Sequence, residues 1–316
     1  MARSSHATSR TRPRARHDVA APLDPLGAPG RSPLTLWNEP AAARRHSTLT
    51  LALAFGGVAF TALQLFVGTQ TGLFPVPGGD VLIWDRVGDG VRAGAPIYYR
   101  ADPLTDSYWY APPLAVVFAA ISWLPPEVQH WLYLIPRIAA LRVIAGSWIG
   151  AGIACWFPLV AFDIGGGNFN LPIAAAIVAA VRGHPQLAVL AGLAKFGPAL
   201  AIHPRDWRKA LPVLAIACAI TLPWLHLWPE WIAHLVSNIA SPLGPQISIP
   251  LPVRLAAAAG LLLLVRTRWS RALAATIAIP AFYWGSLVVL IAPLAVAIRD
   301  RSRFTHESPV VMAGTP

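Results

Sequence analysis

Long apolar runs recur along this chain, and they limit its fold more than any other feature. The first covers Leu51 to Val67, and the others cover about 111–124, 129–145, 146–162, 168–181, 186–202, 210–228, 250–266 and 272–298. About 20 apolar residues are needed to cross the ~30 Å hydrocarbon core of a bilayer. Of the 316 residues, 55% are hydrophobic and 12% are charged, whereas a soluble domain has about 25% charged residues. The sequence therefore predicts an all-α, polytopic transmembrane protein with about 8–10 membrane helices.

Arginines gather in the terminal segments and in the short loops between the apolar runs. Segment 1–47 is rich in arginine and proline and lacks apolar periodicity, which predicts a disordered basic tail. In segment 69–110 aspartates outnumber arginines, so the positive-inside rule places this loop outside. We therefore expect a cytoplasmic N-terminus, a multi-pass domain over 48–298 in the cytoplasmic (plasma) membrane, and a cytoplasmic tail over 299–316.

Two of the apolar runs conflict with straight membrane crossings. Basic residues flank the runs 186–202 and 272–298 at both ends, so both ends of each run are expected on the cytoplasmic side. Pro280 and the segment Lys195-Phe196-Gly197-Pro198 would each interrupt a helix. These two runs are therefore predicted to be broken or re-entrant helices, which are tolerated where they pack against protein or a water-filled cavity.

Several function classes lack support in the sequence. The net charge is +11, but no basic patch is interleaved with exposed aromatic residues, so we expect membrane lipids rather than nucleic acid as partners. Cys155 and Cys218 both lie inside apolar runs, which argues against a disulfide framework. No Walker loop, HExxH motif or metal-ligand spacing is present. We expect neither a metal site nor a cofactor.

The outer loop contains one segment, 78–92, with a helical pattern of polar and apolar residues. At about 100° per residue, Trp84, Val87 and Val91 form one face, whereas Asp85, Asp89 and Arg92 share a separate one, which is most simply solvated. Asp80 falls on the opposite side, with Trp84, where an interfacial helix would meet protein or lipid. Two readings of Asp80 remain open from this pattern: a functional carboxylate, or an N-cap following Gly78 and Gly79.

Aromatic residues are dense in the second half of the outer loop, around Tyr98 and Tyr110. A belt of aromatic side chains at the membrane interface would explain them. A carbohydrate site with aromatic platforms beside a carboxylate would explain them equally well. Residues 210–253 contain no lysine or arginine, so the stretch near 229–249 is also expected outside. His226 and His234 lie in or beside this stretch, near Trp224, Trp228 and Trp231, either as packing residues or as groups that orient a sugar hydroxyl or phosphate.

Several short motifs follow one another over most of residues 48–266. They are Asp80, Trp84, Gly94, Tyr98, Tyr110-Ala111-Pro112-Pro113, Gly167-Asn168-Phe169-Asn170-Leu171, Ala191-Gly192-Leu193-Ala194-Lys195-Phe196-Gly197-Pro198, Gln246-Ile247-Ser248 and Arg254. In this order they resemble the motifs of glycosyltransferase family 87. The chain departs from the family in its shorter length, in Asn168, which replaces a glutamine, and in residues 245–248, where the family has Asn-Gln-Ser.

The resemblance implies a GT-C fold and an inverting hexosyltransferase. Such an enzyme takes mannose or a related hexose from a polyprenyl phosphate and transfers it to a lipid or glycan acceptor. Asp80 would then be the catalytic base, and Lys195 and Arg254 would bind the donor phosphate, although both cations could instead reach lipid headgroups. The expected substrate-binding residues are Tyr98, Tyr110, Asn168, His226, His234, Gln246 and Ser248.

Two other functions remain open at this point. A transporter or flippase of lipid-linked sugars would need ionisable residues along a central path, and in the sequence most charges fall in loops and at helix ends. An inactive family member acting as a membrane scaffold is the second alternative, because the chain is short and its motifs are altered. Asp163, which precedes three glycines, would be costly inside a membrane and is of interest for that reason.

Overall fold

The computed structural model describes residues 47–99, 107–240, 249–280 and 284–306, and these residues form helices and connections without a strand. The all-α prediction is thus confirmed. The α-helices are α1 (Thr48–Gln70), α2 (Gly79–Ala93), α3 (Pro112–Ala119), α4 (Pro126–Ala145), α5 (Trp148–Ala154), α6 (Pro158–Gly166), α7 (Asn170–Val181), α8 (Pro185–Lys195), α9 (Trp207–Ala219), α10 (Leu227–Ala240), α11 (Leu251–Gly260), α12 (Arg268–Ile277) and α13 (Ile291–His306). The short turns η3 (Gly197–Ala201) and η7 (Trp284–Leu290) precede α9 and α13.

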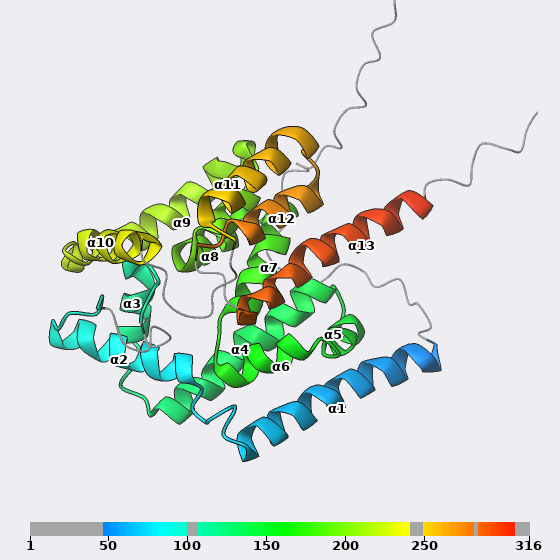
Figure 1. Ribbon diagram of the computed structural model, residues 1–316, viewed down its shortest axis with the longest axis horizontal. Coiled ribbons are helices and arrows are strands. Elements are labelled where there is room, and N and C mark those ends of the chain that lie inside the picture. Colours follow the sequence, from blue (N-terminus) through cyan, green and yellow to red (C-terminus); the bar gives the residue numbers. More distant parts are fainter. Residues whose placement is uncertain (1–46, 100–106, 241–248, 281–283, 307–316) are drawn as a thin grey trace, which may run out of the picture.

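Helix α7 forms the centre of the molecule (Figure 1). Its residues from Ile173 to Val181 are all buried, and each of them is alanine, isoleucine or valine. Helices α4, α8, α12 and α13 pack around it. Small side chains allow neighbouring helices to approach closely, so an alanine-rich helix is suited to a position with neighbours on every side.

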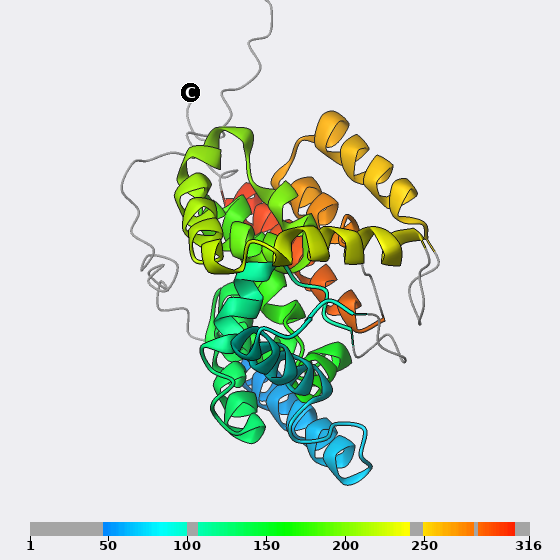
Figure 2. The same ribbon diagram turned by 90° about the vertical axis from the view of Figure 1, so that its left-hand side faces the viewer.

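Helix α1 is the clearest candidate for a membrane span. Among the described residues it is the one helix that is long and apolar enough to cross a bilayer. Two bent pairs, α4 with α5 (103°) and α6 with α7 (116°), raise the number to three if each pair counts as one span. Figures 1 and 2 place α1 along one edge of the molecule, where it packs against α5 and α6.

The apolar runs are divided into shorter helices than the sequence led us to expect. The run 146–162 becomes α5 and the start of α6, and the segment 111–124 contains only the eight-residue α3. Prolines begin α3, α4, α6 and α8, and a proline that starts a helix cannot continue the one before it. The predicted break after Lys195 is confirmed, because α8 ends there and Phe196 has a φ of +21°.

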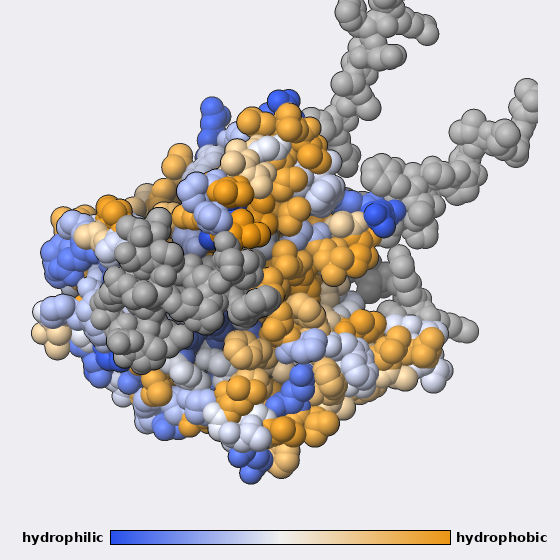
Figure 3. Space-filling view, in the orientation of Figure 1, coloured by the Kyte–Doolittle hydropathy of each residue, from blue (hydrophilic) through white to orange (hydrophobic). Residues whose placement is uncertain are grey.

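The surface carries large apolar side chains over several helices, as Figure 3 shows for one face of the molecule. Those exposed include Phe55, Leu63 and Phe66 on α1, Leu263 and Leu264 after α11, and Leu294 and Ile298 on α13. Large exposed apolar areas mark surfaces that contact a membrane or another protein. The surface is therefore consistent with membrane association.

The structure describes only a small part of the two predicted tails. The predicted N-terminal tail lies outside the described residues, apart from residue 47. At the other end, α13 continues through the expected boundary at residue 299 as far as His306. Arg299 links α13 to α4, because its Nη2 atom donates a hydrogen bond of 2.7 Å to the Ile144 carbonyl. Residues 307–316 lie outside the described part of the chain.

Candidate functional site

Helix α2 is docked through the apolar face that the sequence predicts. Trp84, Val87 and Val91 are buried, and α2 packs against α3 and α4. The Trp84 ring stacks on Phe118 and on Phe169, with ring centroids 5.2 Å and 4.4 Å apart. This contact joins α2 to the turn that precedes α7.

The beginning of α2 lies directly on the glycine turn between α6 and α7. A Cβ atom added at Gly78 would lie 2.7 Å from the carbonyl carbon and oxygen of Gly166, so only glycine fits there without a shift. The Gly78 N–H also donates to His130 Nδ1 over 3.2 Å. Gly167 has a φ of +82°, in the left-handed region that glycine adopts readily. These contacts place Asp80, two residues further along, beside the start of α7.

Asp163 organises that turn from inside the protein. Its side chain is fully buried, and its two carboxylate oxygens accept hydrogen bonds from the N–H groups of Asn170 (3.2 Å) and Leu171 (3.1 Å). These N–H groups belong to the first turn of α7 and have no partner within the helix. A carboxylate at this position also interacts favourably with the helix dipole.

Arg137 is a site residue that our sequence analysis missed. It lies inside α4, is fully buried, and donates from Nε to the Asn168 carbonyl over 2.8 Å and from Nη2 to the Gly167 carbonyl. The sequence did contain a signal, because an arginine in the middle of an apolar run is costly and commonly functional. Arg137 interacts electrostatically with Asp163 and Asp80.

Asp80 lies in the first turn of α2, partly buried and surrounded by these groups. No described residue donates a hydrogen bond to its carboxylate, and the N-cap position belongs to Gly78, so the N-cap reading is not supported. Burial raises the pKa of Asp80 to about 6, while the positive charges of Lys195 and Arg137 act in the opposite direction. The carboxylate is therefore without a bound partner and is largely ionised at neutral pH.

Lys195 reaches the same region from the end of α8. Its Nζ atom donates to Asn170 Oδ1 over 2.7 Å and to Ser286 Oγ over 3.3 Å. Asn168, the asparagine singled out from the sequence, uses its Oδ1 atom to accept from the Phe169 N–H over 3.0 Å. Asn170 is thus the residue of this motif that contacts the cation, while Asn168 contributes its carbonyl to Arg137.

The predicted aromatic residues Tyr98 and Tyr110 lie together near Asp80. The Tyr98 hydroxyl donates to the Tyr110 carbonyl over 2.8 Å, and the Tyr110 side chain is buried and interacts electrostatically with Asp80. His234 is buried, with its ring 5.4 Å from that of Trp109 and 6.0 Å from that of Tyr98. His226 is exposed before α10. Gln246 and Ser248 lie outside the described residues.

Arg254 has a different environment from Lys195. It is buried, and its guanidinium donates to the carbonyls of Ile249 (3.1 Å), Ile277 (3.1 Å), Ile279 and Pro280 (2.8 Å). Three of these carbonyls lie at the end of α12 or just beyond it, where helix carbonyls lack partners within the helix. These contacts explain Arg254 as a link between α11 and α12, and no described contact joins it to Asp80.

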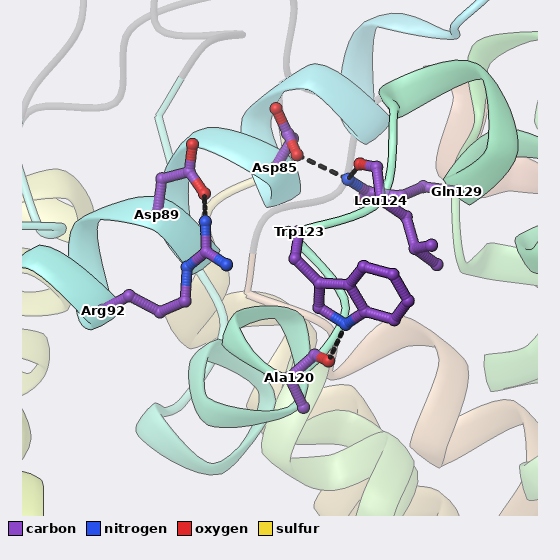
Figure 4. Close-up of polar contacts among 7 residues, drawn as sticks. All are labelled: Asp85, Asp89, Arg92, Ala120, Trp123, Leu124 and Gln129. Carbon is purple, nitrogen blue, oxygen red and sulfur yellow. Dashed lines mark hydrogen bonds and ion pairs between the residues drawn. The ribbon is translucent and has the colours of Figure 1, made fainter.

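Figure 4 shows the polar face of α2, where the sequence predicted a solvated surface. Asp89 and Arg92 form an exposed ion pair of 2.8 Å, as expected of such a face. Asp85 is instead partly buried and accepts a hydrogen bond from Gln129 Nε2, which also donates to the Leu124 carbonyl over 2.9 Å. Asp85 therefore joins α2 to the start of α4.

Comparisons with protein-family models, with curated proteins and with solved structures find no match. Within the described residues, no group of three or more histidine, cysteine, aspartate or glutamate side chains is arranged to hold a metal ion. The functional interpretation therefore depends on the site itself: an unpartnered carboxylate, two cations and an aromatic cluster.

Proposed function

We propose that this chain is a multi-pass membrane glycosyltransferase of the GT-C type. It transfers a hexose, most simply mannose, from a polyprenyl phosphate to a lipid or glycan acceptor at the outer face of the cytoplasmic membrane. The observation that carries this proposal is the Asp80 carboxylate, which has no hydrogen-bond donor among the described residues and lies within electrostatic range of Lys195 and Arg137.

The chemistry assigned to Asp80 is that of a general base. A carboxyl with a pKa of about 6 is mostly ionised at neutral pH and still basic enough to accept a proton. The acceptor oxygen attacks the anomeric carbon and loses its proton to Asp80, while the bond from that carbon to the phosphate oxygen breaks. This single displacement inverts the anomeric configuration and releases the polyprenyl phosphate.

The leaving phosphate gains negative charge during this step and is stabilised by a nearby cation. Lys195 is suited to this role because Asn170 and Ser286 direct its ammonium group, which keeps one further N–H for a ligand. Charge-assisted hydrogen bonds are about twice as strong as neutral ones. Tyr98, Tyr110 and His234 supply the aromatic surface for a sugar ring.

The membrane arrangement is part of the proposal. Helix α1 crosses the bilayer from a cytoplasmic N-terminus, and α2 follows on the outer side with its polar face toward water. The bent pairs α4 with α5 and α6 with α7 complete further crossings. Of the helices that follow, α8, α12 and α13 pack against α7, as broken helices do where protein surrounds them.

One observation favours a lipid-linked sugar transporter as a second candidate. Arg137, Asp163 and Lys195 come from three different helices and meet inside the molecule. Ionisable residues in the interior of a helical membrane protein commonly mark a transport path. A transporter would move the donor across the bilayer without changing it.

The deciding experiment measures both activities in proteoliposomes made with purified protein. Radiolabelled polyprenyl phosphate mannose is supplied with a membrane lipid extract as acceptor, and new labelled product is measured separately from donor translocation. Wild type is compared with Asp80→Asn and with the matched control Asp89→Asn, which changes an exposed aspartate of the same helix.

Transfer by wild type and by Asp89→Asn, but not by Asp80→Asn, would support the enzyme and its base. Translocation without transfer would support the transporter. If folded protein shows neither transfer nor translocation with several sugar donors, the result would favour an inactive scaffold.

A further inference from the structure

Arg137 differs from the other cations of the site in how completely the protein encloses it. Its side chain is fully buried in α4, and Nε and Nη2 are bound to the carbonyls of Asn168 and Gly167. Its third nitrogen, Nη1, is also buried and has no hydrogen-bond partner among the described residues. A guanidinium remains charged in proteins, so a positive charge is held permanently at this point.

The turn that fixes Arg137 is the same turn that receives the start of α2. Gly78 contacts the backbone of Gly165 and Gly166, and Arg137 binds the next two carbonyls along the chain. The position of the guanidinium and the position of Asp80 are therefore set by one short backbone segment.

We propose that Arg137 is a positioning residue for Asp80: its fixed guanidinium keeps the carboxylate ionised at neutral pH, and so ready to accept a proton. This inference rests on the proposed function for its significance, but the electrostatic relation can be tested without it. Lys195 has a different task, because a bound donor phosphate would neutralise its charge. Arg137 is enclosed and keeps its charge whether or not the donor is bound.

Several other groups around Asp80 also affect its protonation. Helix α4 also brings His130 and Tyr133 to this side of α2, Tyr110 precedes α3, Asp163 lies on α6, and Lys195 ends α8. Of these, Lys195 is the other cation that acts on Asp80. Asp163 interacts with both cations and so limits the net positive charge near Asp80.

The test reads the protonation of Asp80 directly, without donor or acceptor. Dicyclohexylcarbodiimide reacts with protonated carboxyl groups in apolar surroundings, and the modified residue is identified by mass spectrometry of the purified protein in detergent. The rate of Asp80 modification is measured against pH, which gives a midpoint for each variant. Asp80→Asn identifies the signal, because it removes the modified residue.

Arg137→Gln is expected to raise the Asp80 midpoint by about one pH unit, the usual minimum effect of a close opposite charge. Arg137→Lys keeps the charge and is expected to restore the wild-type midpoint. Arg142→Gln is the matched control, because Arg142 lies on the same helix and is not among the charges that act on Asp80. Thermal melting of each variant reports whether it is folded.

An unchanged midpoint in folded Arg137→Gln would overturn the inference, as would a midpoint raised equally in Arg137→Lys. If the glutamine variant does not fold, the lysine variant decides alone: a retained midpoint supports the role of the charge, and a raised one contradicts it. If the wild type transfers no sugar, the proposed function is contradicted, but the measured effect of Arg137 on the protonation of Asp80 still stands.

Discussion

The Nζ atom of Lys195 lies 2.7 Å from the Oδ1 atom of Asn170, the first residue of the central helix α7. The ammonium group of Lys195, which belongs to α8, is therefore oriented by a residue of α7. Any ligand that binds Lys195 depends on where α7 begins. That starting point depends in turn on Asp163, which accepts the first N–H groups of α7.

Loss of the Asn170 amide should weaken donor binding more than the chemical step. We expect Asn170→Ala to raise KM for the polyprenyl phosphate sugar about fivefold, which corresponds to the free energy of roughly one hydrogen bond. The reason is that the Lys195 ammonium group keeps its charge but loses its orientation. Steady-state kinetics with varied donor concentration measure this. Asn168→Ala is the comparison, because the Asn168 side chain accepts a hydrogen bond from the Phe169 N–H, whereas Lys195 donates to the Asn170 side chain. An equal effect in both variants would argue against the orientation of Lys195 by Asn170.

Replacing Asp80 should abolish activity without costing stability. A general base contributes about 10² to 10⁴ in rate, so Asp80→Asn should lose at least a hundredfold in kcat. Folding raises the pKa of Asp80 from its ordinary value of 3.8 to about 6, so the folded state loses stability as the pH rises from about 4 to about 6, and the penalty is complete at neutral pH. The neutral asparagine avoids this penalty, and we expect a melting temperature equal to or above that of wild type. A variant that melts markedly lower would show that the carboxylate is structural.

The pH dependence of transfer should reflect the same group. Protonation of Asp80 removes the base, so kcat/KM is expected to fall as the pH decreases through about 6 and to reach a plateau above it. Initial rates over a pH series, at donor concentrations well below KM, measure this limb. Full activity retained at a pH close to 4 would exclude a base with this pKa.

A methyl group at Gly78 should separate α2 from the glycine turn. Gly78→Ala places a Cβ atom 2.7 Å from the Gly166 backbone, and overpacking of this kind costs about 1–3 kcal/mol. We expect a lower melting temperature and loss of transfer, because Asp80 moves with the helix. Gly79→Ala is the matched control, since nothing lies within 4 Å of a Cβ at that position. Equal destabilisation by both changes would mean that helix propensity, and not this contact, is responsible.

The hydrogen bond from Gln129 to Asp85 should contribute measurably to the docking of α2. A double-mutant cycle with Asp85→Ala and Gln129→Ala is expected to give a coupling free energy of about 1–2 kcal/mol in denaturant unfolding. The exposed pair of Asp89 and Arg92 offers a comparison on the same helix, where coupling of about 0.2–1 kcal/mol is typical. A coupling for Asp85 and Gln129 no larger than that of the exposed pair would contradict the role assigned to this contact.

Local patterns predicted the parts of the fold that depend on near neighbours. The helical class follows from the apolar runs, the buried face of α2 follows from the spacing of Trp84, Val87 and Val91, and the break after Lys195 follows from Gly197 and Pro198. The same patterns overestimated helix length, because hydropathy alone does not show where a proline ends one helix and begins the next.

The composition of the site depended on contacts between distant segments. Asn168 and Asn170 are equivalent in a sequence motif, and only the orientation of the α7 start decides that Asn170 meets Lys195 while the Asn168 carbonyl meets Arg137. Arg254 and Lys195 were also equivalent as cations at helix ends. The backbone carbonyls around Arg254 distinguish them.

The sequence by itself determined that this chain is helical and apolar, and that Asp80 lies on the packed side of an amphipathic helix. The tertiary structure alone decided which charges surround Asp80. The reason is physical: Arg137 is separated from Asn168 by 31 residues and Lys195 from Asn170 by 25. Such pairs meet because glycines allow two backbones to touch and because buried carbonyls require donors, and neither condition is visible in the periodicity of one segment.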